Sequence, residues 1–259
     1  MTATVLVHRD APTLAAAVAA RLVTRLVDVQ AATGRASIVL TGGSVGIATL
    51  KALAEMPARA AIDWRNLDVW WGDERFLPAG HADRNETQAR AALLDHVGLD
   101  PERVHAMPPS DGPDGDDPEA AAERYAATLR AAARPEDHGL APSFDVLLLG
   151  VGPDGHIASL FPEKPALYED TRSVVAVRGA PKPPPTRISL TMPTIRNARE
   201  VWLVVAGEDK ASAVRLALSG TGPVQIPAAG AAGRSRTLWL LDRAAAAHVP
   251  ASLARAASP

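Results

Sequence analysis

The chain has 259 residues, of which 47% are hydrophobic and 22% are charged, so it can bury a full core and is not disordered over most of its length. Its 27 Lys and Arg against 29 Asp and Glu exclude the broad basic face that nucleic acids and anionic membranes attract, and the lack of cysteine excludes disulfides, Cys-ligated zinc and thiol catalysis. The first ten residues lack the pattern of a secretion signal, and the longest apolar stretch, Leu14–Ala20, is too short to span a membrane. We therefore expect a cytoplasmic protein.

Helices are predicted where apolar residues recur at spacings of three and four. The longest begins after the capping residues Asp10 and Pro12, carries a stripe from Leu14 to Val29, and ends at Gly34. Further helices are expected at Ile47–Glu55, Asn85–Val97, Glu119–Ala133 and Glu208–Ser219.

Short apolar runs between these helices predict strands. They lie at Ser37–Leu40, Leu67–Trp71, Phe144–Leu149, Ser173–Val177, Arg187–Thr191, Val201–Ala206 and Thr237–Leu241. Runs that are apolar at successive positions are typical of strands buried on both faces of a parallel sheet. The sequence thus predicts an α/β protein, with one domain over residues 1–259, a mainly parallel Rossmann-like sheet and helices on both faces.

In such a sheet, ligands bind in loops at the carboxyl ends of strands. The first of these loops, Thr41-Gly42-Gly43-Ser44, connects a strand to a helix. The glycines let the backbone approach a ligand, Ser44 can cap the helix, and the N–H groups of a helix N-terminus attract anions. The tetrapeptide fits a phosphate site and a plain capped turn equally well.

Three charged residues, Asp73, Glu74 and Arg75, follow strand Leu67–Trp71. Charges are unusual at the point where a sheet opens into its ligand crevice. Arg75 can hold a phosphate or carboxylate in a bidentate pair, or it can pair internally with Asp73 or Glu74. The two interpretations are compatible.

The segment after strand Phe144–Leu149, Gly150-Val151-Gly152-Pro153-Asp154-Gly155-His156, satisfies the GxGxxG fingerprint of dinucleotide-binding proteins. That fingerprint requires a long following helix and an acidic residue after the next strand. Here Pro162 and Pro165 interrupt the helix, and Asp154 would repel a pyrophosphate. We therefore expect no nicotinamide or flavin cofactor.

Asp154 and His156 are instead candidates for acid–base chemistry. An ordinary histidine titrates near neutral pH, and a nearby carboxylate can fix its tautomer and raise its basicity. A lone histidine is usually a structural residue, but the glycine-flanked position at a strand end favours a general base. Asp73, Asp154 and His156 could converge on a metal, yet a single histidine is a weak zinc signal; the chemistry does not need a metal, and we assign no metal ligand.

Three basic residues complete the candidates. Lys182 lies within the stiff run Pro181–Pro185, Arg187 opens the next strand, and Lys210 follows Gly207-Glu208-Asp209 at the start of a helix. A lysine at this entry can reach an anion at the sheet edge, although it can also be a solvent-exposed residue.

Five segments in this order, LTGGS, WGDERFLP, LLGVGPDGHIASLFP, PKPPPTRISLT and GEDKA, resemble those of the 6-phosphogluconolactonases, whose fold is that of the amino-sugar-phosphate isomerases. The resemblance covers nearly the whole chain. It implies a Rossmann-like sheet and the hydrolysis of 6-phospho-D-glucono-1,5-lactone to 6-phosphogluconate, the second step of the oxidative pentose phosphate pathway, without a cofactor. It also implies a monomer with a small sugar-phosphate substrate and no nucleic-acid or membrane partner.

The resemblance assigns roles to individual residues. His156 matches the family's proposed general base, with Asp154 beside it, and Gly42, Gly43 and Ser44 match its phosphate loop. Arg75 and Arg187 match basic residues that face the sugar phosphate, and Lys210 matches the phosphate-site lysine of related deaminases. Asp73 and Lys182 are included as substrate-site residues, and Asn85 belongs to a recurrent family motif without an assigned role.

A mechanism follows from these roles. Ser44, Arg187 and Lys210 are expected to anchor the 6-phosphate, His156 to activate water, and Arg75 or nearby N–H groups to stabilise the oxyanion.

Two alternatives stay open. Glucosamine-6-phosphate deaminases share the fold, but their motif resembles DGHIAFNEP, with a glutamate where this chain has Phe161. A non-catalytic sugar-phosphate sensor would not need His156.

Overall fold

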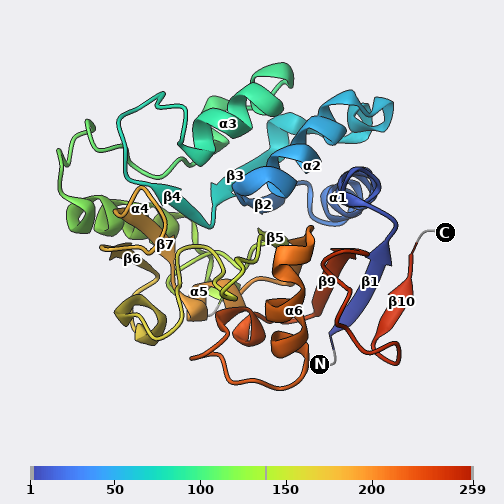
Figure 1. Cartoon of the computed structure of the whole chain (residues 1–259). Coiled ribbons are helices and arrows are strands. Elements are labelled where there is room, and N and C mark those ends of the chain that lie inside the picture. Colours follow the sequence, from blue (N-terminus) through green and yellow to red (C-terminus); the bar gives the residue numbers. More distant parts are fainter. Residues whose placement is uncertain (1–2, 138, 258–259) are drawn as a thin grey trace.

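The computed structural model describes residues 3–137 and 139–257, and a seven-stranded sheet forms their centre (Figure 1). All pairings in this sheet are parallel, and the strand order is β10-β1-β9-β8-β5-β2-β3. The strands are β1 (Thr4–His8), β2 (Ala36–Leu40), β3 (Leu67–Trp71), β5 (Val146–Leu149), β8 (Glu200–Val205), β9 (Arg236–Asp242) and β10 (Ala254–Ala256). The predicted α/β architecture is confirmed; β1 and β10 were not predicted.

Helices cover both sides of this sheet, with α1 and α2 above it and α6 below it in Figure 1. The α-helices of the described residues are α1 (Ala11–Thr33), α2 (Gly43–Glu55), α3 (Asn85–Ala92), α4 (Pro118–Ala132), α5 (Met192–Arg196) and α6 (Ala211–Leu218). The predicted stripe of α1 is buried from Leu14 to Val29, and the Asp10 carboxylate accepts the Thr13 N–H at 2.8 Å, as an N-cap should.

Two helices are shorter than predicted. Asn85–Val97 contains α3 and then a separate 3-10 turn, Leu94–His96, while Glu208–Lys210 is a 3-10 turn before α6. The short helix α5 was not predicted.

A second, antiparallel sheet lies beside the first, in the order β4-β7-β6. It consists of β4 (Asp73–Arg75), β7 (Arg187–Leu190) and β6 (Val174–Val177), with α4 packed against β6 and β7. Asp73–Arg75 is predicted to be a loop after β3, and this prediction is wrong: all three residues pair with β7. The charged segment after β3 therefore has a fixed backbone.

The order of the parallel strands reverses between β2 and β5. From β2 the chain continues outward to β3, whereas from β5 it continues through β8 and β9 in the opposite direction. Loops that leave neighbouring strands in opposite directions open a crevice at the carboxyl ends of those strands. The Thr41 side chain bridges the two loops here, since its Oγ1 accepts the Gly150 N–H at 3.2 Å.

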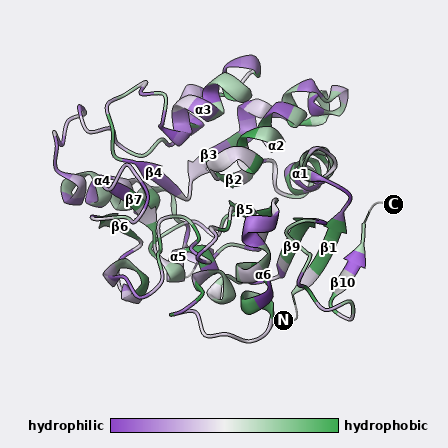
Figure 2. Cartoon of the chain, viewed as in Figure 1, coloured by the Kyte–Doolittle hydropathy of each residue, from purple (hydrophilic) through white to green (hydrophobic). Residues whose placement is uncertain are grey.

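Apolar residues are concentrated in the strands, and polar residues lie on the outer parts of the helices and loops (Figure 2). Trp70, Trp71 and Trp202 are each 1% exposed and are among the largest core side chains. Within the described residues, none of the helices combines the length and apolar character needed to cross a membrane.

Candidate active site

A cavity of about 290 Å³ opens at the reversal point between β2 and β5. It lies where the central sheet meets the small sheet, and segments from both contribute to its lining. Nine of the predicted site residues line it: Gly42, Gly43, Ser44, Asp73, Arg75, His156, Lys182, Arg187 and Lys210. Asp154 is the remaining predicted residue, and it contacts His156 outside this lining. Residues from five separate segments are thus brought together.

The loop after β2 presents the N-terminus of α2 to the cavity. Gly42 is the N-cap of this helix and provides no side-chain cap, so the prediction that Ser44 caps the helix was wrong: Ser44 lies within the first turn. The first N–H groups of a helix have no partner inside the helix, and together with the helix dipole they attract anions. Gly43 has a φ of +79°, a conformation that favours glycine.

The predicted pair of His156 and Asp154 is formed. The His156 Nδ1 lies 2.5 Å from the Asp154 Oδ1, and the imidazole is 15% exposed. Burial tends to raise the pKa of Asp154, but the hydrogen bond from His156 and its charge outweigh this effect and lower that pKa to about 2. Since an ionised carboxylate only accepts hydrogen bonds, Nδ1 carries a proton, and in the neutral form of the imidazole Nε2 keeps its lone pair.

Gly152 supplies the space that this imidazole occupies. A Cβ atom on Gly152 would overlap the His156 ring at Nδ1 and Cε1 and would lie 2.6 Å from the Asp154 Oδ1. The Gly152 N–H donates to the His156 carbonyl at 2.9 Å and closes the loop beneath the ring. No α-helix follows this loop within residues 157–173, in agreement with the interruption predicted from Pro162 and Pro165. Gly152, one of the glycines of the apparent dinucleotide fingerprint, therefore makes room for the histidine.

Phe161 packs against the His156 ring. Its ring centroid lies 4.5 Å from that of His156, and the Arg187 guanidinium lies 5.9 Å above the same ring. Phe161 is 1% exposed, so the imidazole rests on a buried apolar surface. A glutamate at this position, as in the deaminase motif, would place a second carboxylate beside the histidine.

Asp73 is buried on β4 and has two partners. Its Oδ2 accepts a hydrogen bond from the Ser159 hydroxyl at 2.7 Å and lies 4.0 Å from the Arg187 Nη1. Ser159 was not identified from the sequence, because nothing in its local pattern indicates a contact with a residue 86 positions away.

Arg187 is 5% exposed and divides its donors between the chain and the cavity. Its Nε donates to the Pro184 carbonyl at 3.1 Å, and its Nη2 donates to the Lys182 carbonyl at 3.0 Å. The guanidinium thus holds the proline-rich loop, while Nη1 points toward Asp73.

The other three cations of the lining, Arg75, Lys182 and Lys210, come from three different segments of the chain. Arg75 is fixed by a hydrogen bond from Nη1 to the Asp83 carbonyl, and the Lys210 ammonium pairs with Asp209. Lys182 is exposed in the loop that Arg187 holds, and its charge contributes to lowering the pKa of Asp209, after the larger effect of Lys210. Cations from both sheets therefore face one space, as binding a phosphorylated ligand requires.

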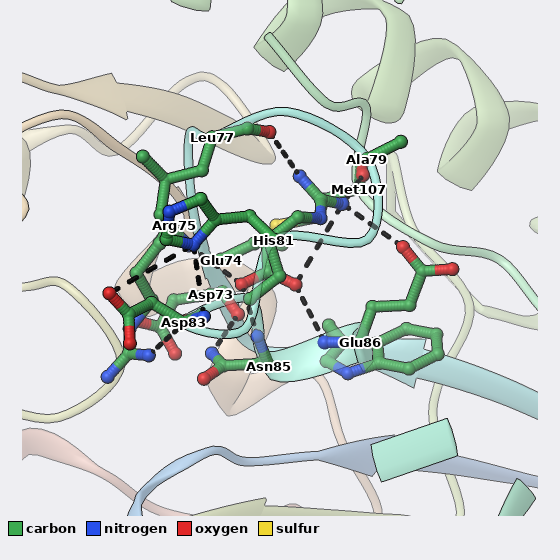
Figure 3. A network of polar contacts seen from close by, with 12 residues as sticks. Asp73, Glu74, Arg75, Leu77, Ala79, His81, Asp83, Asn85, Glu86 and Met107 are labelled. Carbon is green, nitrogen blue, oxygen red and sulfur yellow. Dashed lines mark hydrogen bonds and ion pairs between the residues drawn. The ribbon is translucent and has the colours of Figure 1, made fainter. Parts of the chain in front are cut away.

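A buried charged network surrounds Glu74 of β4 (Figure 3). The Glu74 carboxylate accepts the backbone N–H groups of Arg75 at 2.8 Å, Asn85 at 2.6 Å and Glu86 at 2.8 Å, and lies 3.9 Å from Arg84. Glu74 and Arg84 are 1% and 0% exposed. An internal ion pair of Glu74 with Arg75 is one of the predicted alternatives; the charged partner of Glu74 is instead Arg84.

The described residues contain no group of three His, Asp or Glu side chains arranged to hold a metal ion.

The parallel sheet, the helix N-terminus and the carboxylate-held histidine define an α/β protein with a cationic ligand cavity. The chain belongs to the family of glucosamine-6-phosphate isomerases/6-phosphogluconolactonase, whose sequence profile matches residues 9–239.

Named relatives and solved structures agree with this assignment. The chain is 65% identical over 247 residues to a 6-phosphogluconolactonase of Streptomyces coelicolor, and the match covers 95% of each chain. It is 51% identical over 250 residues to a 6-phosphogluconolactonase of Mycobacterium tuberculosis, and this match covers 96% of the chain and all of the relative. The 6-phosphogluconolactonase structure from Trypanosoma brucei superimposes with a TM-score of 0.82 at 29% identity, covering 96% and 99% of the two chains. A monomeric glucosamine-6-phosphate deaminase, at 20% identity, 94% and 99% coverage and a TM-score of 0.75, shares the fold.

Proposed function

We propose that this protein is an enzyme that hydrolyses 6-phospho-D-glucono-1,5-lactone to 6-phospho-D-gluconate in the oxidative pentose phosphate pathway. The observation that carries the proposal is the geometry of His156: its Nδ1 is held by an ionised Asp154, and its ring lines the cavity that α2 and four cationic side chains also line. The names of the relatives at 65% and 51% identity support the same substrate.

In this mechanism, the Nε2 of His156 takes a proton from a water molecule as the water oxygen attacks C1 of the lactone. The C1 carbonyl oxygen becomes an oxyanion, which Arg75 or nearby N–H groups stabilise. When the bond between C1 and the ring oxygen breaks, the imidazolium returns its proton to the ring oxygen, which becomes the C5 hydroxyl. The new carboxylic acid then ionises in solvent.

Ser44, Arg187 and Lys210 anchor the 6-phosphate, while Asp73 and Lys182 contact or orient groups nearby. The support is their place on the cavity lining beside the N-terminus of α2. Fixing the phosphate at one end holds C1 near His156 at the other, so that binding energy contributes to positioning.

We propose that the protein acts as a monomer in the cytoplasm and has no nucleic-acid partner. The small net charge of −2 supports the last point, because nucleic-acid binding draws on concentrated positive charge. Size-exclusion chromatography with light scattering tests the monomer.

The function is tested with purified protein and 6-phosphogluconolactone generated in situ, by following acid release against the spontaneous rate. Glucosamine-6-phosphate is assayed in parallel for ammonia. Acceleration of lactone hydrolysis without ammonia is expected. Ammonia release would contradict the argument from Phe161, and inactivity in both assays would favour a sugar-phosphate sensor.

A further inference from the structure

The two glycines of the loop after β2 are needed for different physical reasons. Gly43 has a positive φ, and a Cβ atom there would have no heavy atom within 4 Å. Gly42 has a φ of −80° and a ψ of −161°, a conformation open to any residue. Its constraint is space: a Cβ on Gly42 would overlap the Asn85 Oδ1 and lie 2.5 Å from Cγ and 3.0 Å from Nδ2. The side-chain amide of Asn85 therefore fills the position of a side chain at residue 42.

Asn85 is fixed from the opposite side. It is the first residue of α3, it is 2% exposed, and its backbone N–H donates to the Glu74 carboxylate at 2.6 Å. Its Nδ2 donates to the Asp73 carbonyl at 2.8 Å, which turns Oδ1 toward the Gly42 backbone. Figure 3 shows the Asn85 side chain among these groups of β4.

The Oδ1 atom of Asn85 is buried and has no hydrogen-bond partner within the described part of the chain. A buried carbonyl without a partner is unfavourable, since it has lost its water without replacement. The hydrogen bond from Nδ2 to the Asp73 carbonyl fixes this orientation, in which the amide separates Gly42 from Asp73. Asn85 also lines the cavity together with both of these residues.

We propose that Asn85 is a positioning residue, whose amide sets the distance between the Gly42–Gly43 loop and the Asp73–Arg75 strand. The proposal rests on the proposed function in one respect, namely that the loop binds the phosphate of the substrate. In this arrangement the loop and the strand belong to different sheets, and the amide of Asn85 is a neutral spacer between them. A carboxylate of the same shape would lose the hydrogen bond to Asp73 and add negative charge beside the phosphate.

The test is a double-mutant cycle with Gly42→Ala, Asn85→Ala and the combined variant. Affinity for 6-phosphogluconate is measured by calorimetry, and KM and kcat for the lactone are measured in parallel. Gly42→Ala is expected to weaken binding about 10-fold or more, because the new methyl group displaces the loop. Asn85→Ala is expected to weaken it less. The combined variant should bind no more weakly than Gly42→Ala alone, since removing the amide makes room for the methyl group.

Gly43→Ala is the matched control. Its penalty comes from the positive φ and not from a clash, so Asn85→Ala should leave that penalty unchanged. Asn85→Asp should raise KM more than Asn85→Ala, because its added charge opposes the phosphate.

Independent effects of Gly42→Ala and Asn85→Ala on binding would overturn the proposal. The proposal would also be overturned if the two substitutions were coupled in their effect on the melting temperature but not in their effects on KM or affinity. The contact between Gly42 and Asn85 would then be purely structural. If the wild-type protein binds 6-phosphogluconate with the expected coupling but does not accelerate lactone hydrolysis, the proposed function fails and the positioning inference stands.

Discussion

At the residue scale, the properties of His156 depend on three neighbours that act differently. The Asp154 Oδ1 lies 2.5 Å from Nδ1 and keeps a proton on that nitrogen. Gly152 leaves space for the ring, and the Phe161 ring packs against it with the two centroids 4.5 Å apart. Only the first neighbour acts through charge. The other two restrict where the imidazole can lie, and a base must be held in position to be effective.

Replacing His156 by alanine tests the chemical step. We expect kcat to fall by about 10²–10⁴-fold with a small change in KM, because the base acts mainly in the transition state. Steady-state kinetics measured above the spontaneous rate check this, with His248→Ala as a control at an exposed histidine outside the cavity lining. A kcat within about threefold of wild type would remove His156 as the base.

Replacing Gly152 by alanine tests positioning without removing a polar group. The new methyl group overlaps the His156 ring, so we expect kcat to fall about 10–100-fold. Binding of 6-phosphogluconate should change much less, since the proposed phosphate-binding residues Ser44, Arg187 and Lys210 keep their side chains. Gly98→Ala is the control, because a Cβ there meets no atom within 4 Å and its φ is not positive. Equal losses of kcat and of affinity would indicate that the whole loop had moved.

At the element scale, the sequence predicts five of the seven strands of the central sheet and the residues that directly follow them. Apolar runs identify buried strands, and the carboxyl ends of parallel strands meet at one edge, so the positions of Gly42 and His156 could be inferred. The small sheet was missed at β4, because Asp73–Arg75 is short and charged. Its polar groups are satisfied by partners distant in sequence, such as Ser159 and Arg84, which no local pattern reveals.

The N-terminus of α3 illustrates the same dependence. Its N-cap is Arg84, which makes no side-chain cap, and the Glu74 carboxylate of β4 accepts the N–H groups of Asn85 and Glu86 instead. A capping residue supplied by another element joins α3 to the small sheet. The position of Asn85, whose side chain donates to the Asp73 carbonyl, therefore depends on Glu74.

This buried carboxylate predicts a pH dependence of stability. Burial raises the pKa of Glu74 from 4.5 to about 7, against the opposing effects of Arg84 and the three N–H donors. Because the folded state holds the proton more tightly, the contribution of Glu74 to stability is fully present below about pH 4.5 and is lost as the pH rises to about 7.

Thermal unfolding of wild type and Glu74→Gln between pH 4.5 and 7.5 checks this prediction. The wild-type melting temperature should fall relative to that of Glu74→Gln as the pH rises, by about 2–4 °C for each kcal/mol lost. The difference between the two curves isolates Glu74 from the other carboxyl groups. A constant difference across this range would show that Glu74 keeps one protonation state in the folded protein.

At the scale of the whole molecule, the cavity lies across the junction of the two sheets. The central sheet contributes the N-terminus of α2 and the loop after β5, and the small sheet contributes β4 and the loop before β7. A ligand that contacts all four segments connects the two sheets, so binding should stabilise the complete fold and not only one loop.

Thermal unfolding with 6-phosphogluconate measures this connection. A ligand at about 100 times its Kd adds about 2.7 kcal/mol, which corresponds to a rise in the melting temperature of about 5–10 °C for a chain of this size. Lys210→Ala should reduce this rise at the same ligand concentration, because it removes a cation from the cavity lining. Lys51→Ala removes an exposed lysine of α2 from outside the lining and should leave the rise unchanged. Both variants lose one positive charge. If the ligand-induced rise in the melting temperature were reduced equally in both, ligand binding would depend on the net charge of the protein and not on the position of Lys210.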